Sequence, residues 1–209
     1  RVRVLRTASV NEAGRYVLYW VRTAMRAHEN PALDAAISLA NTLCLPLLVH
    51  QEFSSRFPYA SDRHVLFMLQ GARELRKQLQ RLDIPYAAHV EREGQCQSWL
   101  HDLAKRAAVM VTEDMPACRM RAWTYESLGG SDGPVLAVDT ACIVPMQLVG
   151  QAYDRAYKYR QATKKLYGTR ITAAWPDMPR PPRHGNLPAL PFEPVDFETD
   201  DLERLVAAC

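Results

Sequence analysis

The chain has 209 residues, a formal net charge of +3 and five cysteines. This length suits one ordinary domain with a tail, and the mild charge argues against a uniformly basic nucleic-acid binder. The cysteines are scattered, odd in number and never form a C-x-x-C pair, which favours reduced thiols in the cytoplasm over a disulfide framework or a zinc site. No apolar run approaches the roughly 20 residues that a membrane span needs, so we expect no membrane partner.

Residues 16–150 show strands and helices in alternation, after a mixed and polar lead-in at 1–15. The apolar run 16–21 predicts a central strand covered on both faces. Asn30 and Pro31 then predict the N-cap and first position of a helix. Further apolar runs predict strands at 46–50, 84–90, 108–112 and 134–138, and helical spacing predicts helices at about 61–82, 96–107 and 117–128.

This alternation with short connections predicts an α/β fold of three layers, α/β/α, around a Rossmann-like sheet. We expect five parallel strands in the order 3-2-1-4-5, counted from the strand at 16–21. Ligands of such sheets lie beyond the carboxyl ends of the strands. The loops at 22–29, 51–61 and 113–117 are therefore expected around one crevice.

The composition changes after residue 150. Residues 151–175 are expected to form a basic interdomain helix, because the stretch 152–171 carries six Lys/Arg, one Asp and four Tyr. This stretch contacts either a phosphate backbone or, as we favour, another domain through its tyrosines. Residues 176–194 hold seven of the fourteen prolines, so 176–209 is interpreted as a Pro-rich linker and the start of a C-terminal domain that this sequence lacks.

The sequence lacks the common catalytic and nucleotide-binding motifs. No G-x-G-x-x-G follows the first strand, so a dinucleotide pyrophosphate against the backbone is not expected. The six histidines show no metal spacing, and we predict neither a catalytic residue nor a metal ligand. Glu113 and Asp114 are either an acid/base or ribose-binding pair or charges at a helix N-terminus.

Two segments resemble a known family. The stretch YWVRTAMRAHENPALDAAISLAN resembles the opening of the photolyase/cryptochrome superfamily, with matches at Trp20, Arg22, Arg26, Asn30, Ala32 and Leu33. Residues 57–86 are similar to class II cyclobutane pyrimidine dimer photolyases, with matches at Phe57, Pro58, Ala60, Arg63, His64, Phe67, Met68, Leu69 and Gly71. The loop VTEDMPACRMRAW is loosely similar, through Arg119 and Trp123.

The resemblance implies the N-terminal α/β domain of a light-dependent DNA-repair flavoprotein. In that family a C-terminal helical domain holds FAD, whose reduced form donates an electron that splits the dimer. This helical domain and, through it, damaged DNA are the expected partners. The chain alone would be inactive in repair and would serve as a scaffold that holds an antenna chromophore, a deazaflavin or a folate.

The candidate antenna crevice combines flat apolar side chains with cations for an anionic tail. Its expected residues are Arg22, Arg26, His50, Phe53, Phe57, Arg63, Glu113, Asp114 and Met115. Each is alternatively a loop residue buried against the other domain. Two other functions stay open: a cryptochrome-type photoreceptor, and a stand-alone nucleotide-binding module such as an adenine-nucleotide sensor or an electron-transfer-flavoprotein-like subunit.

Overall fold

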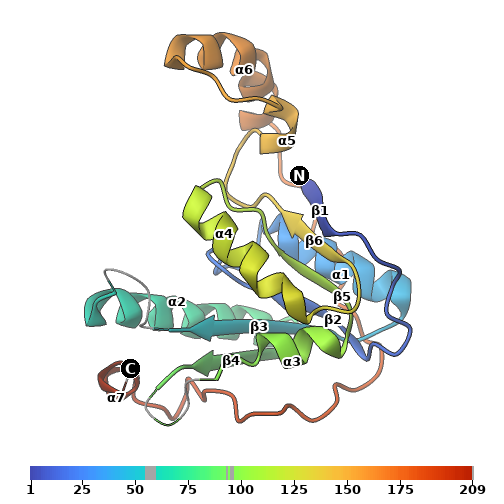
Figure 1. The fold of residues 1–209 in the computed structure, drawn as a ribbon, viewed down its shortest axis with the longest axis vertical. Helices are drawn as coiled ribbons and strands as arrows, with labels where there is room; N and C mark the ends of the chain where they lie inside the picture. Colours follow the sequence, from blue (N-terminus) through green and yellow to red (C-terminus); the bar gives the residue numbers. More distant parts are fainter. Residues whose placement is uncertain (55–59, 93, 95–96, 209) are drawn as a thin grey trace.

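A six-stranded sheet forms the centre of the protein (Figure 1). The computed structural model describes residues 1–54, 60–92, 94 and 97–208. The strands are β1 (Val2–Arg6), β2 (Tyr16–Trp20), β3 (Leu47–Phe53), β4 (Tyr86–Val90), β5 (Ala107–Glu113) and β6 (Val135–Val138), in the order β1-β6-β5-β2-β3-β4. The strands from β2 to β6 run parallel, and β1 pairs antiparallel with β6.

The prediction of five strands is wrong, because part of the expected lead-in forms β1. Val2 pairs with Val138, and Val4 pairs with Leu136, at the edge of the sheet. The side chains of Val2 and Val4 remain 53% and 54% exposed. Backbone pairing with β6 therefore holds β1 in the sheet. The other strands were predicted from a buried apolar face, and β1 shows this signal only weakly.

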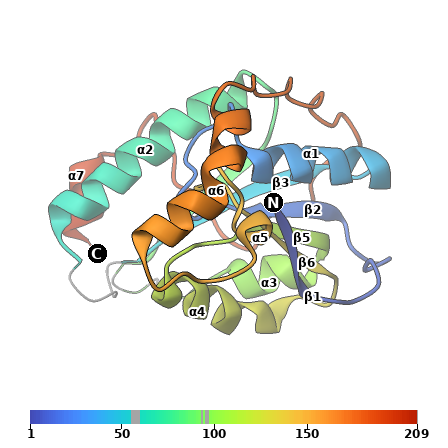
Figure 2. The ribbon, with the colours of Figure 1, turned by 90° about the horizontal axis from the view of Figure 1, so that it is seen from above.

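Helices cover both faces of the sheet (Figure 2). One layer contains α1 (Pro31–Leu43) and α2 (Asp62–Gln80), and the other contains α3 (Leu100–Lys105), α4 (Cys118–Glu126) and the 3-10 helix η1 (Ser127–Gly130). Alternate residues of β2 serve the two layers. Val17 and Tyr19 pack with α1 and α2, whereas Tyr16, Leu18 and Trp20 pack with α3. This explains why the strand is apolar throughout.

The start of α1 is confirmed at the position that the sequence predicts. The side-chain oxygen of Asn30 accepts hydrogen bonds from the backbone N–H groups of Ala32 and Leu33, both at 3.1 Å. Pro31 occupies the first turn, where its missing N–H is not needed. The amide group of Asn30 also donates to the carbonyls of Ala24 (3.2 Å) and Arg26 (2.9 Å), so one buried side chain fixes both the helix and the preceding loop.

The basic segment forms α6 (Ala156–Ile171), which follows the short helix α5 (Met146–Val149) and projects from the sheet (Figure 1). Thr163 is its buried residue. Its tyrosines contact one another: the hydroxyls of Tyr159 and Tyr167 lie 3.2 Å apart, and the ring of Tyr153 lies edge-on to Tyr159. Most of this helix is thus open to solvent.

The Pro-rich segment 176–194 contains no helix or strand and runs back along the α/β domain (Figure 1). Phe192 is partly buried and packs against the core cluster that includes α3. The N–H of Val195 donates to the carbonyl of Ala88 on the edge strand β4 (3.0 Å). The last helix, α7 (Leu202–Ala207), packs on α2. The segment is therefore a strap on this domain, and its role as a linker to a further domain stays a prediction. Across the parts of the chain that the structure describes, no helix combines the length and the apolar character of a bilayer span.

Candidate functional site

A groove of about 690 Å³ opens where β2 and β3 end, between α2 and α4. This is the edge of the sheet at which open α/β folds bind ligands. Its described lining consists of Arg22, Thr23, Gln51, Glu52, Phe53, Ser54, His64, Met68, Met120 and Trp123. The first two predicted loops contribute to it, but one face of α4 forms the third wall instead of the loop at 113–117.

Arg22 provides the cation of the groove. Its guanidinium lies 4.3 Å from the centre of the Trp20 ring, and its Nη1 donates to the hydroxyl of Thr124 at 3.1 Å. Burial lowers the pKa of Arg22, and the nearby carboxylate of Glu113 opposes that shift. Stacking and hydrogen bonding hold the guanidinium at the groove wall, where it can meet an anionic group of a ligand.

The other walls are flat and apolar. Phe53 comes from the end of β3, Met68 from α2, and Met120 and Trp123 from α4. Met120 is not among the site residues predicted from the sequence, and Met68 and Trp123 appear there only as matches to a family pattern. The available signal was helical spacing: Met120 and Trp123 are three residues apart, which places them on one face of α4.

Glu113 lies behind the groove instead of in it. Its carboxylate is fully buried and accepts hydrogen bonds from the backbone N–H groups of Arg22 (2.8 Å), Thr23 (2.9 Å) and Ala24 (3.0 Å). The hydroxyl of Thr23 donates to the same carboxylate at 2.9 Å. Glu113 therefore fixes the turn after β2, from which Arg22 reaches the groove.

Three more predicted residues stabilise loops around the sheet. The guanidinium of Arg26 donates to the carbonyls of Glu29 (3.1 Å) and Thr140 (3.2 Å). Met115 is buried, with its sulfur 3.6 Å from the Thr23 hydroxyl. Asp114 forms an ion pair with Arg3 of β1 at 3.2 Å. Burial raises the pKa of Asp114, and Arg3 opposes the rise.

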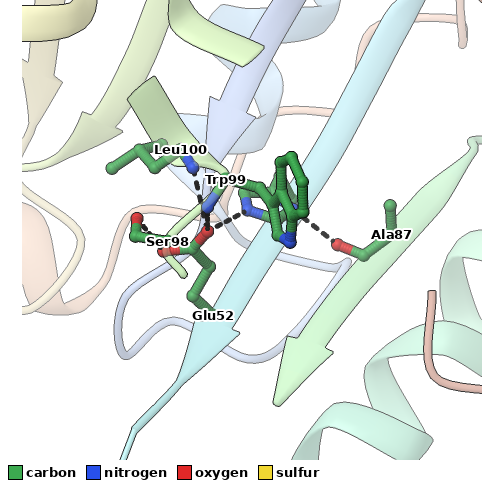
Figure 3. A network of polar contacts seen from close by, with 6 residues as sticks. Glu52, Ala87, Ser98, Trp99 and Leu100 are labelled. Carbon is green, nitrogen blue, oxygen red and sulfur yellow. Dashed lines mark hydrogen bonds and ion pairs between the residues drawn. The ribbon is translucent and has the colours of Figure 1, made fainter. Parts of the chain in front are cut away.

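His50 is buried and belongs to a polar network around Glu52, which lines the groove. Figure 3 shows Glu52 of this network with its partners at the start of α3. The Nδ1 of His50 lies 2.8 Å from the carbonyl oxygen of Ala87, and its Nε2 lies 3.1 Å from Oε1 of Glu52. Three donors at the start of α3 meet the Glu52 carboxylate: the Ser98 hydroxyl (2.7 Å) and the backbone N–H groups of Trp99 (2.6 Å) and Leu100 (2.9 Å). Both ring nitrogens of His50 thus face oxygen atoms of other residues.

These contacts set the ionisation of Glu52. Burial opposes the charged form, but the hydrogen bond and charge of His50, with the hydrogen bonds from Ser98 and Trp99, outweigh burial and lower the pKa of Glu52. Because the carboxylate also lines the groove, it links the ligand groove to the first turn of α3.

The structure therefore brings only part of the predicted crevice together. Among the residues that the structure describes, Arg22 and Phe53 line the groove. The other predicted residues described above make internal contacts instead, and their role in binding an antenna stays a prediction: Arg26, His50, Glu113, Asp114 and Met115. Arg63 is exposed in the first turn of α2. Phe57 lies outside the described residues.

The fold and groove define an open, mostly parallel α/β domain with a groove at the carboxyl ends of its strands. The sequence pattern of the DNA photolyase family matches residues 17–182. The chain therefore belongs to the DNA photolyase family.

Two curated relatives agree with this assignment, and one solved structure shares the fold. A deoxyribodipyrimidine photo-lyase of Methanothermobacter thermautotrophicus is 34% identical over 70% of this chain and 32% of its own length. An Arabidopsis thaliana protein of the same name is 34% identical over 41% of this chain and 18% of its own length. An archaeal photolyase from Sulfolobus tokodaii, solved with two FAD molecules, shares the fold with a TM-score of 0.53 and 15% identity, over 71% of this chain and 34% of that one. The chain thus spans about a third of the length of the Methanothermobacter and Sulfolobus proteins.

Proposed function

We propose that this chain is the N-terminal α/β domain of a class II type cyclobutane pyrimidine dimer photolyase and that its groove holds an antenna chromophore. The observation that carries this proposal is the composition of the groove. Flat apolar walls from Phe53, Met120 and Trp123 surround one fixed cation, Arg22, at the ligand-binding edge of the sheet. This combination suits a planar ring system with an anionic substituent.

The residues present fit a deazaflavin or a folate. Met68, Met120 and Trp123 would contact the ring faces, and the guanidinium of Arg22 would meet a carboxylate or an ionised ring oxygen. Such a chromophore absorbs light and passes on the excitation energy, and it does no bond chemistry at this site. The groove residues are therefore needed for binding, orientation and the exclusion of water, and the proposal requires no acid or base among them.

The repair chemistry belongs, in this proposal, to a helical domain that holds FAD and the lesion, outside these 209 residues. Damaged DNA would reach the protein through that domain, and α6 with the strap would lie next to it. A photoreceptor role or a stand-alone nucleotide module is less well supported, because the named relatives are photo-lyases.

Photorepair of a dimer-containing oligonucleotide tests this proposal. The complete gene product, with its flavin reduced, is expected to restore the oligonucleotide under blue light, whereas the 209-residue chain alone should show neither flavin absorbance nor repair. Repair by the chain alone would contradict the division of labour. A complete gene product that binds FAD but repairs no dimer would contradict the photolyase assignment and favour a photoreceptor.

A further inference from the structure

The turn after β2 contains an anion-binding cradle. The backbone N–H groups of three consecutive residues point to one carboxylate: that of Arg22 donates to Oε1 of Glu113 at 2.8 Å, and those of Thr23 and Ala24 donate to Oε2 at 2.9 and 3.0 Å. The hydroxyl of Thr23 adds a fourth donor at 2.9 Å. Successive N–H groups that point into one concavity bind anions, and in nucleotide-binding α/β folds the turn after the first strand holds a phosphate.

An internal carboxylate fills this cradle. Glu113 reaches it from the end of β5, a strand hydrogen-bonded to β2, and its exposed fraction is 0%. The hydroxyls of Tyr19 (3.3 Å) and Thr140 (3.4 Å) complete the contacts. Every one of these contacts is from a donor, which matches an ionised carboxylate. A buried charge is tolerated only when it is paired and hydrogen-bonded in this way.

The cradle is also held from its other side. Asn30 donates to the carbonyls of Ala24 and Arg26, so the turn is clamped through its carbonyls by Asn30 and through its N–H groups by Glu113. The first residue of the turn, Arg22, sends its side chain to the groove. The position of the groove cation is thus set by a carboxylate that does not line the groove.

We infer that Glu113 is a built-in substitute for phosphate, which positions Arg22 and prevents the turn after β2 from accepting a phosphorylated ligand. Resting on the proposed function, we conclude that the groove binds a planar chromophore that contacts Arg22 through a carboxylate or a ring oxygen. This chromophore places no phosphate at the turn after β2. Because Glu113 occupies the place of a phosphate, no external phosphate has to approach the backbone of this turn, and the turn needs no glycine.

The test removes the internal anion and supplies an external one. In Glu113→Ala, inorganic phosphate or formate is expected to bind at least about tenfold more tightly than in the wild type, to raise the melting temperature above that in sodium chloride of equal ionic strength, and to shift the amide NMR signals of residues 22–24. Asp114→Asn is the matched control. It neutralises the neighbouring buried carboxylate, whose partners are Arg3 and Gln147, and should gain no such binding.

Several results would overturn the inference. If phosphate binds to the wild-type protein and shifts the amide NMR signals of residues 22–24, Glu113 does not block the cradle. If the Glu113→Ala protein folds but binds neither phosphate nor formate, the turn after β2 is not an anion-binding site. If this variant does not fold, Glu113→Gln decides, because its amide group would direct N–H donors at the turn. The inference then predicts a lower melting temperature and shifted signals at residues 22–24, and wild-type values would refute it. No chromophore enters this test, so failure of antenna binding would refute the proposed function separately.

Discussion

Asn30 offers a quantitative test of how the loop behind the groove is built. Replacing it with alanine removes the N-cap of α1, which costs about 1 kcal/mol. It also removes the donor to two backbone carbonyls. The Ala24 carbonyl keeps a second partner, the N–H of Arg26 at 2.8 Å, whereas that of Arg26 loses the contact at 2.9 Å. Leaving one or two buried carbonyls short of a donor adds about 1–3 kcal/mol.

The expected loss in the free energy of unfolding is therefore about 3 kcal/mol, which corresponds to a fall in melting temperature of roughly 6–12 °C for a chain of this size. Urea unfolding followed by tryptophan fluorescence measures it. Asn30→Ser is the control, because serine keeps the capping oxygen but does not reach the two carbonyls, so it should lose about 2 kcal/mol instead of about 3. A loss below about 1 kcal/mol for Asn30→Ala would refute the reasoning.

Two further predictions concern the network around Glu52 and the strap. The pKa of Glu52 is lowered in the folded state, so the unfolded chain binds more protons; the stabilisation by Glu52 is therefore present above the ordinary pKa of 4.5 and is lost as the pH falls below it. Urea unfolding at pH 3.5–6 should show that the free energy of unfolding depends less steeply on pH in Glu52→Gln than in the wild type. An equally steep dependence in both proteins would contradict the network. Phe192→Ala should lower the free energy of unfolding by about 2 kcal/mol, because the partly buried ring packs against His50 and Trp99. Arg76→Ala breaks the part-exposed ion pair with Asp196 and should lower the free energy of unfolding by less than about 1 kcal/mol. If Phe192→Ala and Arg76→Ala lower it equally, packing of the Phe192 ring is not what holds the strap.

Features encoded by neighbouring residues were predictable from the sequence. The uninterrupted apolar run of β2 reflects burial on both faces of the sheet. The pair Asn30 and Pro31 predicts the start of α1, because a cap acts within three residues. The strand β1 escaped prediction because its stability comes from pairing with β6 and not from a buried face.

The role of the site residues depended on contacts between distant segments. Glu113 lies about ninety positions after the turn that it holds, so no local pattern could tell an internal carboxylate from a ligand-binding one. The approach of α4 that places Met120 and Trp123 in the groove is likewise a tertiary contact. Residue type predicted a flat, cationic site, and only the packing shows which cation and which rings line it.

The most direct test of the central claim is the absorption and circular dichroism spectrum of the chain after incubation with a deazaflavin or a folate and removal of unbound chromophore by gel filtration. We expect a retained near-ultraviolet or visible band with induced circular dichroism. The band should be lost in Trp123→Ala, whose ring lines the groove, and kept in Tyr125→Ala, whose ring is exposed on the same helix. Spectra that show no bound chromophore with either compound would contradict the claim that this groove is an antenna site.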